Sequence, residues 1–156
     1  MVKMISIREI MIPVSEYSVI PEQALVGEAI DQLKKSFHRD ERGGLVGHRS
    51  LLVTNKTGEL VGIVTLRNIL KAVLTKHDLP DHYLWIYSVN DSGASMPVKG
   101  VMRAAKIAFV DIEDDLYKVI DLFLAKKVNS LPVLEKGKPV GIIRTIDVFE
   151  IIGMLL

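Results

Sequence analysis

The chain has 156 residues, of which 49% are hydrophobic and 25% are charged, and its formal net charge is +1. These values fit one compact domain or two closely packed halves, and they do not indicate a nucleic-acid-binding protein. Cysteine is absent and the most apolar stretch, residues 146–156, is too short to cross a bilayer, so we expect a cytoplasmic protein without disulfides or membrane contact.

The first half of the chain begins with a short apolar stretch at residues 18–20, which predicts a strand. A helix is expected next, because apolar residues then recur at helical spacing. Residues 36–47 are charged and contain glycine, which predicts a surface loop. The residues that carry the helical pattern are Val26, Ile30, Leu33 and Phe37.

A hairpin is predicted after this loop. The apolar runs 50–53 and 60–64 flank a Lys-Thr-Gly turn, and strands that are apolar at nearly every position are expected to be buried on both faces. A helix should follow from Leu66 to about Leu74. In the next segment we expect Tyr83, Trp85 and Tyr87 to form a short helix or cover, and residues 90–95 to form a polar linker.

The second half of the chain repeats the same order of signals. A short apolar stretch at 108–110 precedes a helical pattern that starts at Leu116. Residues 130–143 predict a second hairpin, and a last helix is expected from Thr145 to about Met154. Both halves therefore read strand, helix, strand, strand, helix, and such internal repetition determines how the whole chain is interpreted.

The repeated unit resembles the cystathionine-β-synthase (CBS) domain. The second copy carries Asn-Ser-Leu-Pro-Val at 129–133 and Val-Gly-Ile-Ile-Arg-Thr-Ile-Asp at 140–147. The first copy carries Arg-Ser-Leu-Leu-Val at 49–53 and Val-Gly-Ile-Val-Thr-Leu-Arg-Asn at 61–68. Two ordered copies of these motifs in one short chain are a much stronger signal than either copy alone.

The resemblance implies an α/β (α+β) fold of two β-α-β-β-α repeats that pack about a pseudo-twofold axis as one Bateman-type module. The first repeat would span residues 5–74, with a loop insertion at about 36–47, and the second would span 97–156. Residues 75–96 would link them.

The resemblance also implies a regulatory sensor and no enzyme. Members of the family hold AMP, ADP, ATP or another adenosyl compound as a regulatory ligand in clefts between two repeats. They require no cofactor, and they often form homodimers. This chain would then signal by conformational or oligomeric change to an unknown target protein in trans. The alternative is a ligand-free dimerising scaffold, which the apolar C-terminal helix favours.

A nucleotide requires an apolar slot for adenine, an acceptor for the ribose hydroxyls and donors for phosphate. The resemblance assigns the ribose to Asp147 and to its counterpart Asn68, whereas Arg144 and Thr65 occupy the family's hydroxyl position. We expect the Asp147 site to be the tighter one because its charge strengthens hydrogen bonds. The same residues are also ordinary helix-capping residues. The further candidates are Ala105, Lys106, Ile107, Val128, Asn129, Ser130, Leu131, Pro132 and Thr145, together with His48, Arg49 and Ser50.

Other groups of reactive residues point to no additional chemistry. The run from His77 to His82 contains residue types that bind metals, but the spacing does not place two ligands on one helical face, and Pro80 interrupts any helix. We interpret this run as a polar loop. No nucleophile and base at catalytic spacing stand out elsewhere in the chain.

Overall fold

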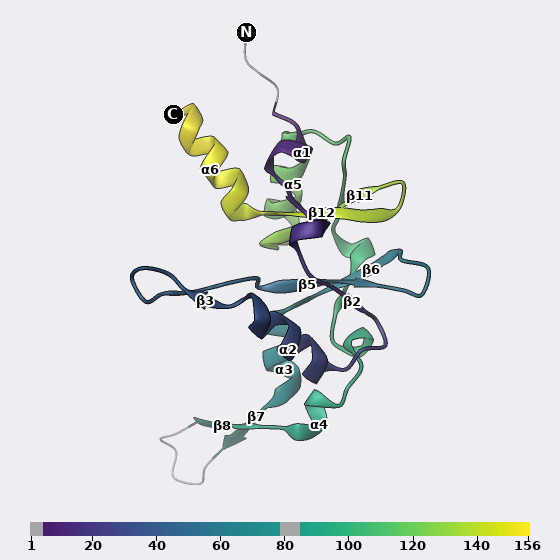
Figure 1. Ribbon diagram of the computed structural model, residues 1–156, viewed down its shortest axis with the longest axis vertical. Coiled ribbons are helices and arrows are strands. Elements are labelled where there is room, and N and C mark those ends of the chain that lie inside the picture. Colours follow the sequence, from purple (N-terminus) through teal and green to yellow (C-terminus); the bar gives the residue numbers. More distant parts are fainter. Residues whose placement is uncertain (1–4, 79–84) are drawn as a thin grey trace.

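The computed structural model describes residues 5–78 and 85–156, which form two four-stranded sheets that face each other (Figure 1). Helices cover the outer side of each sheet. A small apolar cluster joins the sheets: Leu52 and Ile63 come from one, Ile142 comes from the other, and all three are almost completely buried. This arrangement confirms the expected module of two packed α/β repeats.

The first repeat has the predicted order of elements. Strand β2 runs parallel to β5, and β5 is antiparallel to β6. Leu51, Leu52 and Val53 are all completely buried, which confirms that this strand is covered on both faces. The elements are β2 (Val19–Pro21), α2 (Val26–Ser36), β5 (Ser50–Thr54), β6 (Leu60–Thr65) and α3 (Leu66–Val73).

The second repeat has the same order and the same pairing. Strand β10 is parallel to β11, and β11 is antiparallel to β12. The side chain of Asp115 caps the first helix by accepting a hydrogen bond from the amide of Lys118. The elements are β10 (Val110–Asp111), α5 (Leu116–Lys126), β11 (Ser130–Glu135), β12 (Lys138–Arg144) and α6 (Thr145–Leu155).

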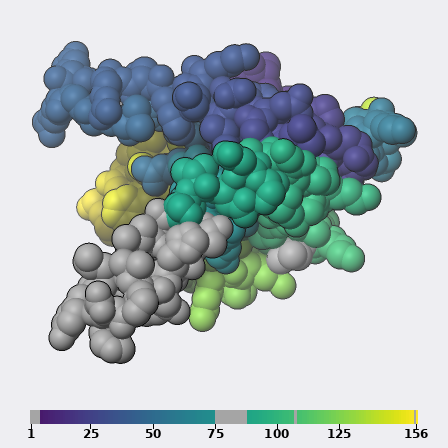
Figure 2. Space-filling model, turned by 90° about the horizontal axis from the view of Figure 1, so that it is seen from below, coloured from purple at the N-terminus to yellow at the C-terminus, as the bar shows by residue number. Residues whose placement is uncertain are grey.

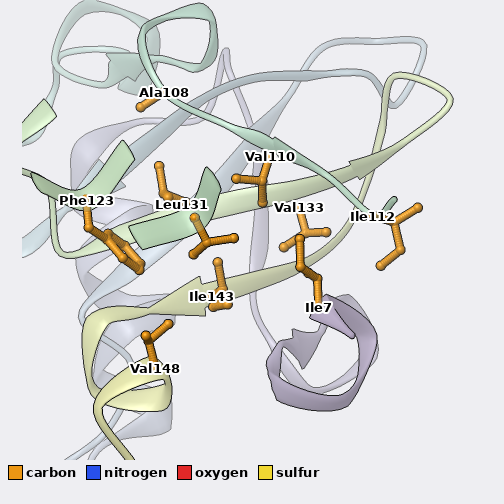
Figure 3. Close-up of a cluster of buried hydrophobic side chains, with 10 residues drawn as sticks. Ile7, Ala108, Val110, Ile112, Phe123, Leu131, Val133, Ile143 and Val148 are labelled. Carbon is orange, nitrogen blue, oxygen red and sulfur yellow. The ribbon is translucent and has the colours of Figure 1, made fainter. Parts of the chain in front are cut away.

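Each repeat also contains a strand from outside its own sequence copy. Strand β1 (Ile12–Pro13), near the N-terminus, pairs with β12 of the second repeat, and β9 (Arg103–Ala104) pairs with β6 of the first repeat. Helix α1 (Ile7–Ile10), which precedes β1 in the chain, also packs against the second repeat. Its residue Ile7 lies beside Val133 and Ile143 in the core of that repeat (Figure 3). The two repeats are therefore joined by exchanged segments as well as by the contact between their sheets.

Two glycines of the repeated motif allow the exchanged strands to approach closely. A Cβ atom on Gly141 would lie 2.6 Å from the carbonyl oxygen of Ile12, and one on Gly62 would lie 2.7 Å from that of Arg103. Any larger residue would push the exchanged strand away. The glycine of each copy is therefore needed for the contact with the other copy's segment.

The insertion between α2 and β5 lies at the surface, as predicted, but it is a hairpin and not an irregular loop. Strands β3 (His38–Arg39) and β4 (Leu45–Val46) pair antiparallel, and all of their residues are exposed. Asp40 closes the turn by accepting hydrogen bonds from the amides of Arg42 and Gly44. Figure 2 shows the insertion (blue) projecting beyond the rest of the molecule.

The segment between the repeats differs from the prediction. Trp85 lies in strand β8 (Trp85–Val89), which pairs with β7 (Leu74–Asp78), so the expected helix over the aromatic residues is wrong. Tyr87 belongs to the same strand, whereas Tyr83 lies outside the described residues. The signal for this strand is the run of aromatic and β-branched residues from Trp85 to Val89, which are residue types that favour strands.

The predicted polar linker is also ordered, as helix α4 (Asp91–Ala94), which packs on α2 and α3. Asn90 begins this helix, because its side chain accepts a hydrogen bond from the amide of Ser92. Gly93 permits the packing, since a Cβ atom there would collide with the carbonyl group of Ala72. In Figure 2 the chain beyond residue 88 (teal to green) spreads over the centre of this face.

Candidate ligand-binding site between the repeats

The facing ends of the two sheets carry polar residues. Ser50 pairs with Thr65 across β5 and β6, and Ser130 pairs with Arg144 across β11 and β12. Side chains two residues apart on a strand share a face, so Thr65 is on the same inward face as the buried Ile63. Polar groups from both repeats therefore meet where the central apolar contact ends.

One group of these residues, the Tyr17 cluster, consists of Tyr17, His48 and Ser50 from the first repeat and Arg144 and Asp147 from the second. Tyr17 directly follows the short helix η1 (Val14–Glu16), which contacts β12. Its hydroxyl and that of Ser50 are 2.6 Å apart in a buried hydrogen bond, and its ring stacks on His48 with the ring centres 4.3 Å apart. Tyr17 is 7% exposed.

Burial sets the charge state of this cluster. It raises the pKa of Tyr17 and lowers the pKa of His48. The positive charge of Arg144 lowers the pKa of His48 further. For Tyr17 the hydrogen bond with Ser50 and the charge of Arg144 both lower the pKa, but burial is the larger effect. At neutral pH both rings are therefore uncharged, and Arg144 is close enough to act on them from the opposite repeat.

Asp147 is held by Arg144. Its Oδ2 atom accepts hydrogen bonds from the backbone amide and from Nε of Arg144, both at 2.9 Å, and its Oδ1 atom lies 2.6 Å from Nη2. The hydrogen bond to Asp147 raises the pKa of Arg144. The Asp147 carboxylate, which was expected to accept hydrogen bonds from the ribose hydroxyls, thus caps α6 and forms a bidentate ion pair with Arg144.

We predict that Tyr17→Phe lowers the free energy of unfolding by about 1–3 kcal/mol, because the substitution leaves the buried hydroxyl of Ser50 without its partner. Urea denaturation measures the change. Tyr117→Phe is the matched control, since Tyr117 is exposed, and it should alter stability by less than about 0.5 kcal/mol. Equal stability of the two variants would contradict this role for the hydroxyl pair.

A second group, the Arg103 cluster, consists of Arg103, Ser130, Thr65 and Asn68. Arg103 stands opposite Ile63 on β9, and cross-strand neighbours share a face, so its side chain points toward the second repeat. Its Nη2 atom donates a 3.0 Å hydrogen bond to the carbonyl oxygen of Ser130. Its Nε atom is buried and has no hydrogen-bond partner among the described residues. Burial lowers the pKa of Arg103.

Thr65 and Asn68 form a reciprocal cap at the start of α3. The Thr65 hydroxyl accepts a hydrogen bond from the Asn68 amide at 3.1 Å, and Oδ1 of Asn68 accepts one from the Thr65 amide at 2.9 Å. Within residues 5–78 and 85–156, no hydrogen bond uses the side-chain Nδ2 group of Asn68. This NH2 group is therefore a hydrogen-bond donor that the cap itself does not use.

The sequence expectation placed Asp147 beside 105–107 and 128–132. Asn129 and Ser130 do adjoin the start of α6, since the Thr145 amide donates a hydrogen bond to the Asn129 carbonyl and Ser130 pairs with Arg144. The segment 105–107 lies elsewhere. Helix η1 contacts β12, whereas η3 (Ala105–Ile107) contacts β6. Asp147 therefore faces Tyr17 and His48, and η3 lies on the side of Thr65. Each cluster takes residues from both repeats, and this crossing follows from the exchanged strands.

Several predicted site residues lie at the margins or within the core. Leu131 is completely buried in the core of the second repeat, away from the junction. The carbonyl groups of Arg49 and Asn129 accept hydrogen bonds from the first amides of α3 and α6, the latter from Thr145. Lys106 is exposed, Val128 is half-buried and Pro132 is buried. The backbone of Ile107 is part of η3.

Tyr17 and Arg103 were not predicted from the sequence. Tyr17 lies in the connection that follows the exchanged strand β1, and Arg103 lies in the exchanged strand β9. Neither aligns with a residue of the same type in the other copy. A comparison of the two copies could have drawn attention to Tyr17, because the equivalent position in the second copy is Ala108. Tyr17 and Ala108 end η1 and η3 in the same way, and the amide of each donates a 3.2 Å hydrogen bond to the carbonyl group of the first residue of the turn.

The sequence model of the CBS-domain family matches the chain twice, over residues 7–75 and 98–153. The chain belongs to the CBS-domain family. No curated protein sequence matches it significantly.

Solved structures with the same fold cover nearly all of this CBS-domain protein. A protein from Methanocaldococcus jannaschii is 24% identical with a TM-score of 0.69, and the match covers 97% of this chain but only 60% of the archaeal one. CBSX2 in complex with AMP is 18% identical with a TM-score of 0.67, covering 96% and 97%. The cytosolic domain of the Mg²⁺ channel MgtE in complex with ATP is 22% identical with a TM-score of 0.66, covering 94% and 48%.

The described residues contain no group of three potential metal ligands, and the run from His77 to His82 extends into residues 79–84, which the structure does not describe. None of their helices has both the length and the apolar character needed to span a bilayer.

Proposed function

We propose that this CBS-domain pair is a non-catalytic regulatory module that binds an adenine nucleotide or another adenosyl compound between its repeats. The observation that carries the proposal is the junction itself, where both polar clusters take side chains from both repeats. A ligand bound there touches both halves, and it can shift their relative orientation if it contacts one arrangement better than another. Such a shift would be passed to a target protein in trans.

The relatives support the class of ligand. CBSX2 was solved with AMP and the MgtE cytosolic domain with ATP. For this chain we propose that the ligand is bound by polar groups at the junction. These groups are the hydroxyl and backbone groups around Ser50 and Ser130 and the helix starts at Thr65 and Arg144. The absence of cysteine is compatible with action in the cytoplasm.

A second candidate function is a dimerising scaffold, and one specific surface favours it. A groove between α5 and α6 is lined almost entirely by apolar atoms, and Phe149 and Leu124 at its border are both 73% exposed. An apolar surface of this kind commonly marks a protein–protein contact. We propose that a second copy of the chain covers it, which is compatible with ligand binding at the junction.

We predict that at least one of AMP, ADP, ATP, S-adenosylmethionine and NAD raises the melting temperature. At about 100 times the dissociation constant, a ligand adds roughly 2.7 kcal/mol to stability, or about 5–10 °C for a chain of this size. Differential scanning fluorimetry with GMP and inorganic phosphate as controls measures the shift. If none of the five compounds changes the melting temperature, the ligand proposal fails and the scaffold is favoured.

A further inference from the structure

We infer that the ligand binds at the Arg103 cluster and not at the Tyr17 cluster, and that Arg103 contacts the anionic group of the ligand. This inference rests on the proposed function and reverses the order of affinity expected from Asp147 alone. It names a phosphate-bearing nucleotide as the preferred class of ligand, since a phosphate group supplies the missing negative charge.

The Tyr17 cluster is already filled by its own side chains. The ring of Tyr17 is buried, its hydroxyl is paired with Ser50, and its face is stacked on His48. Both carboxylate oxygens of Asp147 accept hydrogen bonds from Arg144. A nucleotide would have to break a two-pronged ion pair and displace a stacked aromatic ring to bind there.

The corresponding positions at the Arg103 cluster carry smaller side chains. Ala108 takes the place of Tyr17 after the short helix. The registers of the hairpins place Val128 where the first repeat has His48, and Thr65 where the second has Arg144. Each exchange removes side-chain volume, so the groups that fill one side of the junction have no equivalents on the other.

Arg103 supplies a positive charge that no described residue neutralises. Arg144, the other arginine at the junction, is paired with Asp147. By contrast, Arg103 forms no ion pair with any described residue, and its one hydrogen bond goes to the neutral carbonyl group of Ser130. A guanidinium that is partly buried without an anion is costly, and an anionic ligand would remove that cost.

The remaining groups of the Arg103 cluster are compatible with an anion. Thr65 and Asn68 are neutral, so neither repels a phosphate group, whereas Asp147 would. The Nδ2 group of Asn68 is a hydrogen-bond donor that the helix cap leaves available. The Arg103 cluster therefore offers a positive charge and hydrogen-bond donors to a ligand, whereas the charged groups of the Tyr17 cluster are already paired with each other.

Isothermal titration calorimetry with AMP and adenosine tests the role of Arg103. For the wild-type chain we expect AMP to bind more tightly than adenosine, at one site per chain. Arg103→Met should weaken AMP binding about 10- to 100-fold and leave adenosine binding nearly unchanged, because only the contact with the phosphate is lost. Arg103→Lys should recover part of the AMP affinity, and the exposed Arg42→Met is the matched control without effect.

A second comparison tests which side of the junction binds. Asn68→Ala should weaken AMP binding more than Asp147→Ala does, with circular dichroism and thermal melting confirming that each variant is folded. The inference is overturned if Arg103→Met keeps the wild-type preference for AMP over adenosine, or if Asp147→Ala has the larger effect. A wild-type chain that binds no adenosyl compound overturns the proposed function instead.

Discussion

Replacing Leu52 with alanine should lower the free energy of unfolding by about 2–5 kcal/mol. Leu52 is completely buried, and it packs with Ile63 and Ile142 where the two sheets meet. The substitution removes apolar contact and leaves a cavity that the surrounding strands fill only in part, because both sheets are fixed by their own hydrogen bonds. Urea denaturation followed by circular dichroism measures the loss.

Leu45→Ala is the matched control for this experiment, since the same atoms are removed from a residue that is 55% exposed on the β3–β4 hairpin. It should change stability by less than about 0.5 kcal/mol. We also expect a single unfolding transition for Leu52→Ala, because the exchanged strands keep the repeats in one cooperative unit. A loss of less than about 1 kcal/mol would mean that this contact does not hold the sheets together.

Phe149→Asp should convert the proposed dimer into a monomer. Phe149 is exposed in the single chain and lines the apolar groove between α5 and α6. In a dimer built on this groove, the substitution would bury an unpaired carboxylate in place of a large aromatic ring. Losses of about 2 kcal/mol or more are typical for such central residues, which corresponds to at least a 30-fold weaker association.

Sedimentation velocity at micromolar concentration measures the association. Leu45→Asp places the same charge on an exposed apolar residue that does not line the groove, and it should leave the dimer intact. If the wild-type chain sediments as a monomer, a second copy does not cover the groove. If Phe149→Asp remains a dimer, the contact lies on another surface of the molecule.

Much of the fold could be predicted from the sequence because its signals are local. The helices begin near Val26, Leu66, Leu116 and Thr145 as expected, since each shows apolar residues at helical spacing. The buried strands were equally clear from their continuous apolar runs. The repeat supplied the rest, because each copy supported the assignment of the other.

The arrangement of the junction could not be predicted in the same way. Strands β1 and β9 have two residues each, too few to show a periodic pattern, and which sheet they join depends on contacts distant in sequence. Without knowledge of that crossing, the sequence does not show that Asp147 lies near Tyr17 or that 105–107 lie beside β6, and it does not single out Tyr17 or Arg103. A partly buried cation with no ion-pair partner among the described residues can be recognised only when its surroundings are known.

The exchange of strands β1 and β9 between the repeats has a consequence for biosynthesis. On the ribosome the chain emerges from its N-terminus, yet Ile7 and Ile12 find their places only after β12, which ends at Arg144, has been made. Strand β6 likewise waits for β9, some forty residues later. Because such distant pairings require the closure of large loops, we expect the nascent first half to stay incomplete until β9 and β12 have been synthesised.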